Sequence, residues 1–107
     1  HTDMQLPAFG GLLSCGGWIA AALEEVPMLQ EVILVGPDEK AYAQVESEFQ
    51  QKVQFLSREK LLAMTGEEKN AFFRDLCADL PLYISVDKDV LCTADASTTW
   101  SQADMSL

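Results

Sequence analysis

The sequence predicts an α/β protein in which helices cover both faces of a parallel sheet. Three apolar runs, at residues 31–36, 53–56 and 82–86, are typical of buried strands. Segments with helical spacing separate these runs, in the order helix, strand, helix, strand, helices, strand. Strands that alternate with helices are expected to be parallel and joined by right-handed crossovers. Because three short strands make a thin sheet, we expect residues 1–107 to form one incomplete, three-layer α/β/α domain.

Two helices are predicted in the first half of the chain. A glycine-rich loop over residues 1–17 precedes an alanine-rich helix at 18–26, with Ser14 as a plausible cap and Pro27 at its end. Residues 38–51, DEKAYAQVESEFQQ, repeat apolar side chains at helical spacing and start with two acids that suit the positive end of a helix dipole. We therefore expect one helix between the first two strands.

The second half predicts two further helices and a terminal loop. Residues 57–64, SREKLLAM, open with a serine cap and indicate a short helix. Thr65 and Glu68 have the spacing of a capping box, which predicts another helix from Thr65 to Leu80. Residues 92–107 are polar and irregular, so a loop is expected there.

The charge balance restricts the partners. Seventeen acidic against seven basic residues give a net charge of −10, and no basic cluster is present. Nucleic acid and anionic membrane surfaces are therefore not expected as partners. No apolar run reaches about 18 residues, and no signal-peptide pattern is visible. The three cysteines, Cys15, Cys77 and Cys92, lack metal-finger spacing, which favours a reduced, cytoplasmic setting.

Two aspartates, Asp87 and Asp89, stand where the apolar run at 82–86 stops. On a strand this spacing puts both carboxylates on one face, where they repel each other unless solvent, a lysine or a metal ion lies between them. Ligands of open parallel sheets bind outside the carboxyl ends of the strands. The pair either marks the point where the strand ends and the chain reaches solvent, or it forms part of a binding site.

A second pair of ligand types stands at the other end of the chain, at His1 and Asp3. Imidazole combined with carboxylates suits a divalent ion such as Mn²⁺ or Zn²⁺. Together the two pairs would supply four ligands, and bridging carboxylates would hold two ions. His1 is also open to interpretation as the remnant of a tag.

These segments resemble the arginase, agmatinase and formimidoylglutamase group of ureohydrolases. The stretch YISVDKDVL resembles the group's Ser-x-Asp-x-Asp segment, and HTD resembles the second half of its Asp-x-His-x-Asp segment. LSCGGW after the first motif and TTW after the second are similar to an uncharacterised arginase-like branch. A domain of that family is more than twice as long, and the chain starts without an initiator methionine, so we expect a fragment of the fold.

The resemblance implies a two-manganese site held by His1, Asp3, Asp87 and Asp89. In such a site Asp87 bridges both ions, His1 and Asp89 bind one of them, and Asp3 binds the other. The resemblance also implies a hydroxide nucleophile that attacks a guanidinium or related C–N carbon.

Departures from the family pattern limit this expectation. The first Asp of the Asp-x-His-x-Asp segment and an upstream His ligand are absent, so the isolated chain is expected to bind metal weakly or not at all and to be inactive. Cys15-Gly16 replaces a His-Gly pair, which puts arginine as the substrate in doubt, and Cys92-Thr93 replaces an Asp-Pro pair.

Three side chains outside the metal ligands have open roles. Cys15 either lines the substrate pocket together with Gly16 or is a small packing residue, the second being favoured. Trp100 and Trp18 are candidates for the wall of a substrate site, although the helical spacing of Trp18 favours a place in the core.

The leading hypothesis is a part of an arginase-like binuclear metal hydrolase that acts on the guanidino, amidino or amide C–N bond of a small polar substrate. A non-catalytic arginase-fold protein that binds a ligand or partner through a degenerate metal site is the alternative. A third possibility is a small acidic α/β domain whose aspartates only end a strand. A homo-oligomer is compatible with each of these hypotheses.

Overall fold

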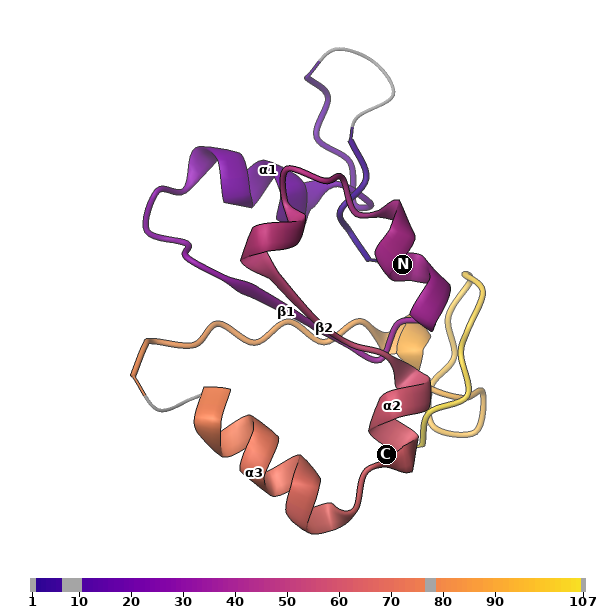
Figure 1. Cartoon of the computed structure of the whole chain (residues 1–107). Helices are drawn as coiled ribbons and strands as arrows, with labels where there is room; N and C mark the ends of the chain where they lie inside the picture. Colours follow the sequence, from indigo (N-terminus) through magenta and orange to yellow (C-terminus); the bar gives the residue numbers. More distant parts are fainter. Residues whose placement is uncertain (1, 7–10, 77–78, 107) are drawn as a thin grey trace. The chain divides into compact units, whose positions relative to one another are not determined.

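The computed structural model describes residues 2–6, 11–76 and 79–106, and it divides into two compact units, His1–Ala63 and Met64–Leu107 (Figure 1). Helices and a small parallel sheet make the chain a mixed α/β protein, as expected. The two units are described separately below. None of the helices in the described residues has the length and apolar character that a membrane span requires.

The sheet of the first unit has two strands. β1 (Val32–Val35) and β2 (Val53–Leu56) are parallel, and Val32 lies opposite Val53 in the register. Both strands fall inside the predicted runs, because both runs have clear local boundaries. The first run is β-branched and stops at Gly36-Pro37, and the second directly precedes a serine cap.

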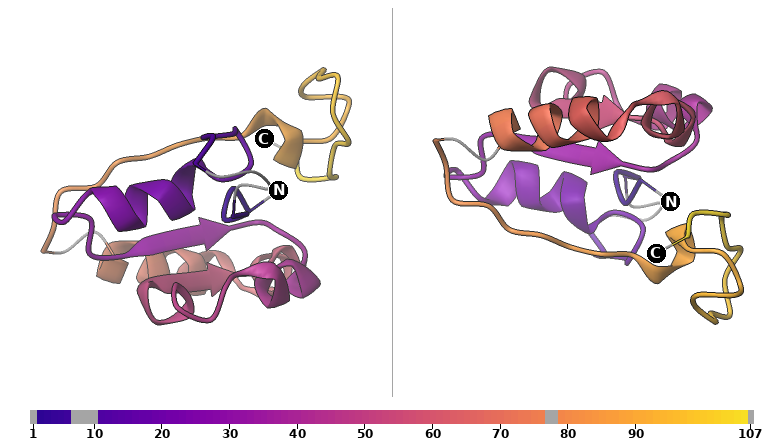
Figure 2. Two further views of the ribbon diagram at one scale, coloured as in Figure 1. Left: turned by 90° about the horizontal axis from the view of Figure 1, so that it is seen from above. Right: turned by 90° about the horizontal axis from the view of Figure 1, so that it is seen from below.

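One face of this sheet carries the core of the first unit. The paired positions on that face pack against the helix α1 (Trp18–Glu25), which lies along β1 in Figures 1 and 2. The buried cluster consists of Met4, Ala20, Leu23, Leu34, Val45, Phe49 and Val53. Met4 is fully buried, so the stretch predicted as a loop over residues 1–17 contributes a side chain to the core.

The cap of α1 differs from the prediction. Gly17 is the N-cap residue, with no side-chain hydrogen bond, and Ser14 contributes only its carbonyl oxygen, which accepts from the Gly17 amide at 3.1 Å. The helix ends at Glu25, where Val26 becomes extended ahead of Pro27.

The single helix predicted for residues 38–51 is wrong. The chain forms two 3₁₀ segments, η1 (Glu39–Gln44) and η2 (Gln50–Lys52), separated by an extended Val45. The Gln50 side chain donates to the Val45 carbonyl oxygen at 3.0 Å in place of the helical ladder. This path buries Val45 and Phe49, so packing overrides the helical spacing in this crossover.

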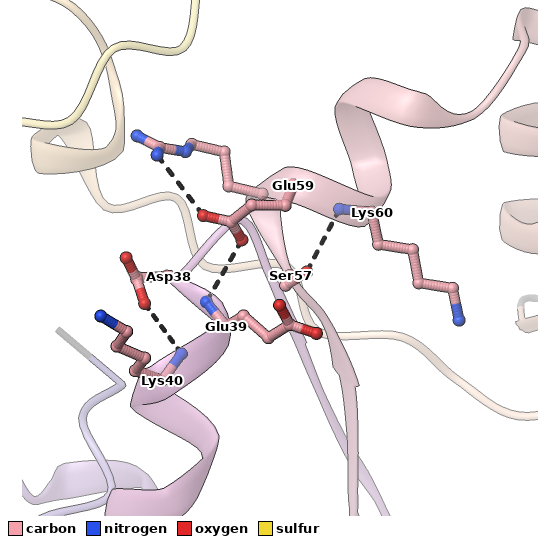
Figure 3. Close-up of polar contacts among 7 residues, drawn as sticks. Asp38, Glu39, Lys40, Ser57, Glu59 and Lys60 are labelled. Carbon is pink, nitrogen blue, oxygen red and sulfur yellow. Dashed lines mark hydrogen bonds and ion pairs between the residues drawn. The ribbon is translucent and has the colours of Figure 1, made fainter.

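Polar contacts join the turns that follow the two strands (Figure 3). The Glu59 carboxylate accepts from the Glu39 amide at 3.2 Å, and Asp38 accepts from the Lys40 amide at 2.8 Å. Ser57 Oγ accepts from the Lys60 amide at 3.2 Å and so caps α2 (Arg58–Ala63), as predicted. Asp38 and Ser57 therefore stabilise backbone groups of their own turns, and Glu59 links its turn to the one after β1.

The second unit opens with the helix α3 (Gly66–Leu76). The predicted capping box is confirmed: the Glu68 amide donates to Thr65 Oγ1 at 3.2 Å, and the Thr65 amide donates to the Glu68 carboxylate at 2.7 Å. No residue of α3 is buried, so the helix contributes no side chain to a core. Residues 77–78 of the predicted helix, which include Cys77, lie outside the described residues, and Asp79 and Leu80 form a bend, so the prediction is wrong for its last two residues.

The strand predicted at residues 82–86 is not present in the structure. The segment is irregular and exposed, with Tyr83 at 83% and Ile84 and Val86 at 72% of their accessible surface. A strand requires a partner for its backbone groups, and the second unit offers none to this run among its described residues. After it come a 3₁₀ turn, η3 (Lys88–Val90), and a loop closed by an isolated bridge between Leu91 and Met105.

Replacing Ser57 by Ala is expected to lower the free energy of unfolding by about 1 kcal/mol, because the Lys60 amide at the start of α2 loses its acceptor. Chemical denaturation measures this change. The exposed Ser47 is the matched control, and Ser47→Ala is expected to stay within about 0.5 kcal/mol of the parent. Equal effects of the two substitutions would contradict the capping role.

Candidate metal centre

Asp3 is held in an unusual backbone conformation at the start of the first unit. Its φ is +55°, in the left-handed region that few residues other than glycine adopt. The carboxylate oxygen Oδ2 accepts a hydrogen bond from the indole Nε1 of Trp18 at 3.0 Å, and the carbonyl oxygen accepts from the Ile19 amide at 3.1 Å. Both donors belong to the first turn of α1, so the helix fixes the side chain and the backbone of Asp3 together.

The residues on either side of Asp3 anchor the segment. Thr2 and Met4 are buried, and the Gln5 amide donates to the Gly16 carbonyl oxygen at 2.9 Å. Asp3 itself is half-buried between these anchors. Residues 2–5 therefore lie against the start of α1, and the predicted metal ligand Asp3 is part of a defined local structure.

Gly17 makes this arrangement possible. A Cβ atom at Gly17 would lie 2.4 Å from the Gln5 carbonyl oxygen, which is backbone and cannot swing away. At Gly16 a Cβ atom would lie 3.1 Å from the end of the Gln5 side chain, which is a milder conflict. The pair Gly16-Gly17 thus permits the close approach of residues 2–5 to the helix.

Asp87 and Asp89 lie in one turn of the second unit. Asp87 precedes η3, and its Oδ1 accepts from the Asp89 amide at 2.9 Å. The sequence predicts that the two carboxylates share one face of a strand. This prediction is wrong, because the run before them is not a strand. Asp87 is exposed and Asp89 is half-buried.

Asp89 is connected to the loop that follows it. Its carbonyl oxygen accepts from the Ala103 amide at 2.8 Å, and the Cys92 amide donates to the Met105 carbonyl oxygen at 2.7 Å. The side chain of Gln102 donates to the carbonyl oxygens of Leu91 and Ala96, which closes the loop from inside. The two aspartates thus stand at the base of a hydrogen-bonded loop.

Of the residues predicted for a substrate pocket, Cys15 and Trp100 are exposed and Gly16 is half-buried. Trp100 is 64% exposed, and the Cys92 thiol donates to Asp95 Oδ2 at 3.3 Å. Cys15 is a free, exposed thiol, so the favoured interpretation of a packing residue is wrong. A shallow hollow of about 120 Å³ lies between residues 11–14 and α1, and neither Cys15 nor Gly16 lines it.

The structure brings some of the predicted ligands together and not others. Asp87 and Asp89 share a turn, Asp3 belongs to the other unit, and His1 lies outside the described residues. Within each unit, no three described His, Cys, Asp or Glu side chains are close enough to hold one metal ion.

The donor chemistry of the described ligands suits a hard divalent cation. Asp3 and Asp87 each use one carboxylate oxygen in a hydrogen bond, and the other oxygen accepts none from the described residues. A carboxylate in this state is able to bind a cation through the second oxygen, and oxygen ligands are those that Mn²⁺ favours.

Sequence reasoning missed Trp18 as the partner of Asp3. The helical spacing of Trp18 favours a core position, and nothing local indicates that its N–H reaches a carboxylate fifteen residues earlier. The signal available in the sequence is the Gly-Gly pair directly before Trp18, which marks a close backbone approach.

Comparisons with known proteins leave the family open. No family model matches the chain, and neither a curated protein nor a solved structure matches it significantly.

Replacing Gly17 by Ala is expected to lower the free energy of unfolding by about 1–3 kcal/mol, because the new methyl group conflicts with the Gln5 carbonyl oxygen. Denaturant titration followed by circular dichroism measures the loss.

Gly66, at the start of α3, is the matched control, since a Cβ atom there meets nothing within 4 Å. Gly66→Ala is expected to leave stability unchanged or to raise it by up to about 1 kcal/mol. A Gly17→Ala variant as stable as the parent would show that residues 2–5 do not pack on α1 in this way.

Proposed function

We propose that this chain is part of an arginase-like binuclear metal hydrolase that acts on a non-peptide C–N bond of a small polar substrate. The bond belongs to a guanidino, amidino or amide group. The observation that carries the proposal is the pair of segments HTD and SVDKD, which occur in the order of the resembled family and contain four ligand-type side chains. Two Mn²⁺ ions are the proposed cofactor.

The local structure around Asp3 supports its role as a ligand. A left-handed aspartate costs conformational energy, and it persists here because Trp18, Ile19 and the buried neighbours hold it. Such a fixed carboxylate loses little freedom when it binds a cation, which favours binding.

The turn at Asp87 and Asp89 supports the second half of the centre. One oxygen of Asp87 is used to cap η3, so the turn fixes the position of its carboxylate relative to Asp89. A net charge of −10 adds a general attraction for cations and repels anionic competitors.

The proposed ligands are His1, Asp3, Asp87 and Asp89. Two divalent cations held by these groups would supply a hydroxide nucleophile at neutral pH and stabilise the charge that develops at the attacked C–N carbon. The protein's own contribution is to fix the carboxylates and to balance the cation charge with three negative side chains.

The proposal includes a larger sheet. The exposed run at residues 82–86 is mostly apolar, contains β-branched side chains and makes no backbone hydrogen bond with the described residues. We propose that this run is a strand of a three-layer α/β/α fold in the intact protein. Asp87 and Asp89 would then follow the carboxyl end of a strand, where parallel sheets bind ligands.

A non-catalytic protein with a degenerate metal site is the second candidate. Cys15 and Cys92 favour it, because they stand where the resembled enzymes have a histidine and an aspartate, and the Cys92 thiol is engaged with Asp95 of its own loop. Turnover of a guanidino or amide compound by the manganese-loaded protein would exclude this candidate.

In the protein as encoded, with any residues before His1 and after Leu107, Asp87→Ala and Asp89→Ala are each expected to weaken Mn²⁺ binding by more than about 100-fold. Loss of an outer-shell partner lowers metal affinity by about 10–100-fold, and loss of a direct ligand lowers it further. Competition titration with a metal-sensitive dye measures the affinity.

Asp75→Ala, which removes an exposed acid of α3, is the matched control and is expected to leave the affinity unchanged. Metal content that is equal in all three variants and the parent would overturn the proposed centre.

Hydrogen exchange tests the proposed strand. In the intact protein the amides of residues 82–86 are expected to exchange as slowly as those of β1, because a strand inside a sheet gives its amides hydrogen-bond partners. Exchange at the rate of an unstructured peptide would show that this run does not join a sheet.

A further inference from the structure

We draw no further inference here: the strongest candidate, the shallow hollow between residues 11–14 and α1, is lined by the exposed Leu12 and Leu13 and by Glu24 and Glu25, and nothing in the structure shows what covers it.

Discussion

The close approach of Gln5 to Gly17 is the constraint on which the first unit depends. Only a residue without Cβ permits it, since a Cβ atom at position 17 would lie 2.4 Å from the Gln5 carbonyl oxygen. Because of this contact Met4 reaches the core and Asp3 reaches the first turn of α1. The same contact therefore determines a helix cap, part of the core and the position of a proposed ligand.

Local signals explain which elements could be predicted. β2, α2 and the capping box of α3 follow from residues adjacent in the sequence, so their boundaries were predictable. The prediction of one helix at 38–51 is wrong because the chain forms two 3₁₀ segments there, and this path buries Val45 and Phe49. Their burial depends on contacts with the sheet, which local spacing does not encode. The prediction of a strand at 82–86 is wrong because a strand needs a neighbouring strand as its partner. The periodicity of apolar residues does not indicate whether such a partner is present.

The sequence offers the residue types of the candidate site and not its geometry. The Asp-x-Asp and His-x-Asp spacings select candidate ligands, and the structure places two of them, Asp87 and Asp89, in one turn. The bond between Trp18 and Asp3 spans fifteen residues and depends on a left-handed backbone and on Gly17. No local pattern encodes that combination, so this contact emerges only from the structure.

The central proposal is that Asp3, Asp87 and Asp89 bind the same pair of metal ions. The most direct measurement is a crystal structure of the manganese-loaded protein as encoded, with anomalous data collected at the manganese edge. The account predicts two anomalous peaks in contact with all three carboxylates, with Trp18 Nε1 still donating to Asp3. An ordered structure in which Asp3 and Asp87 lie far apart, with no peak beside either, would contradict it.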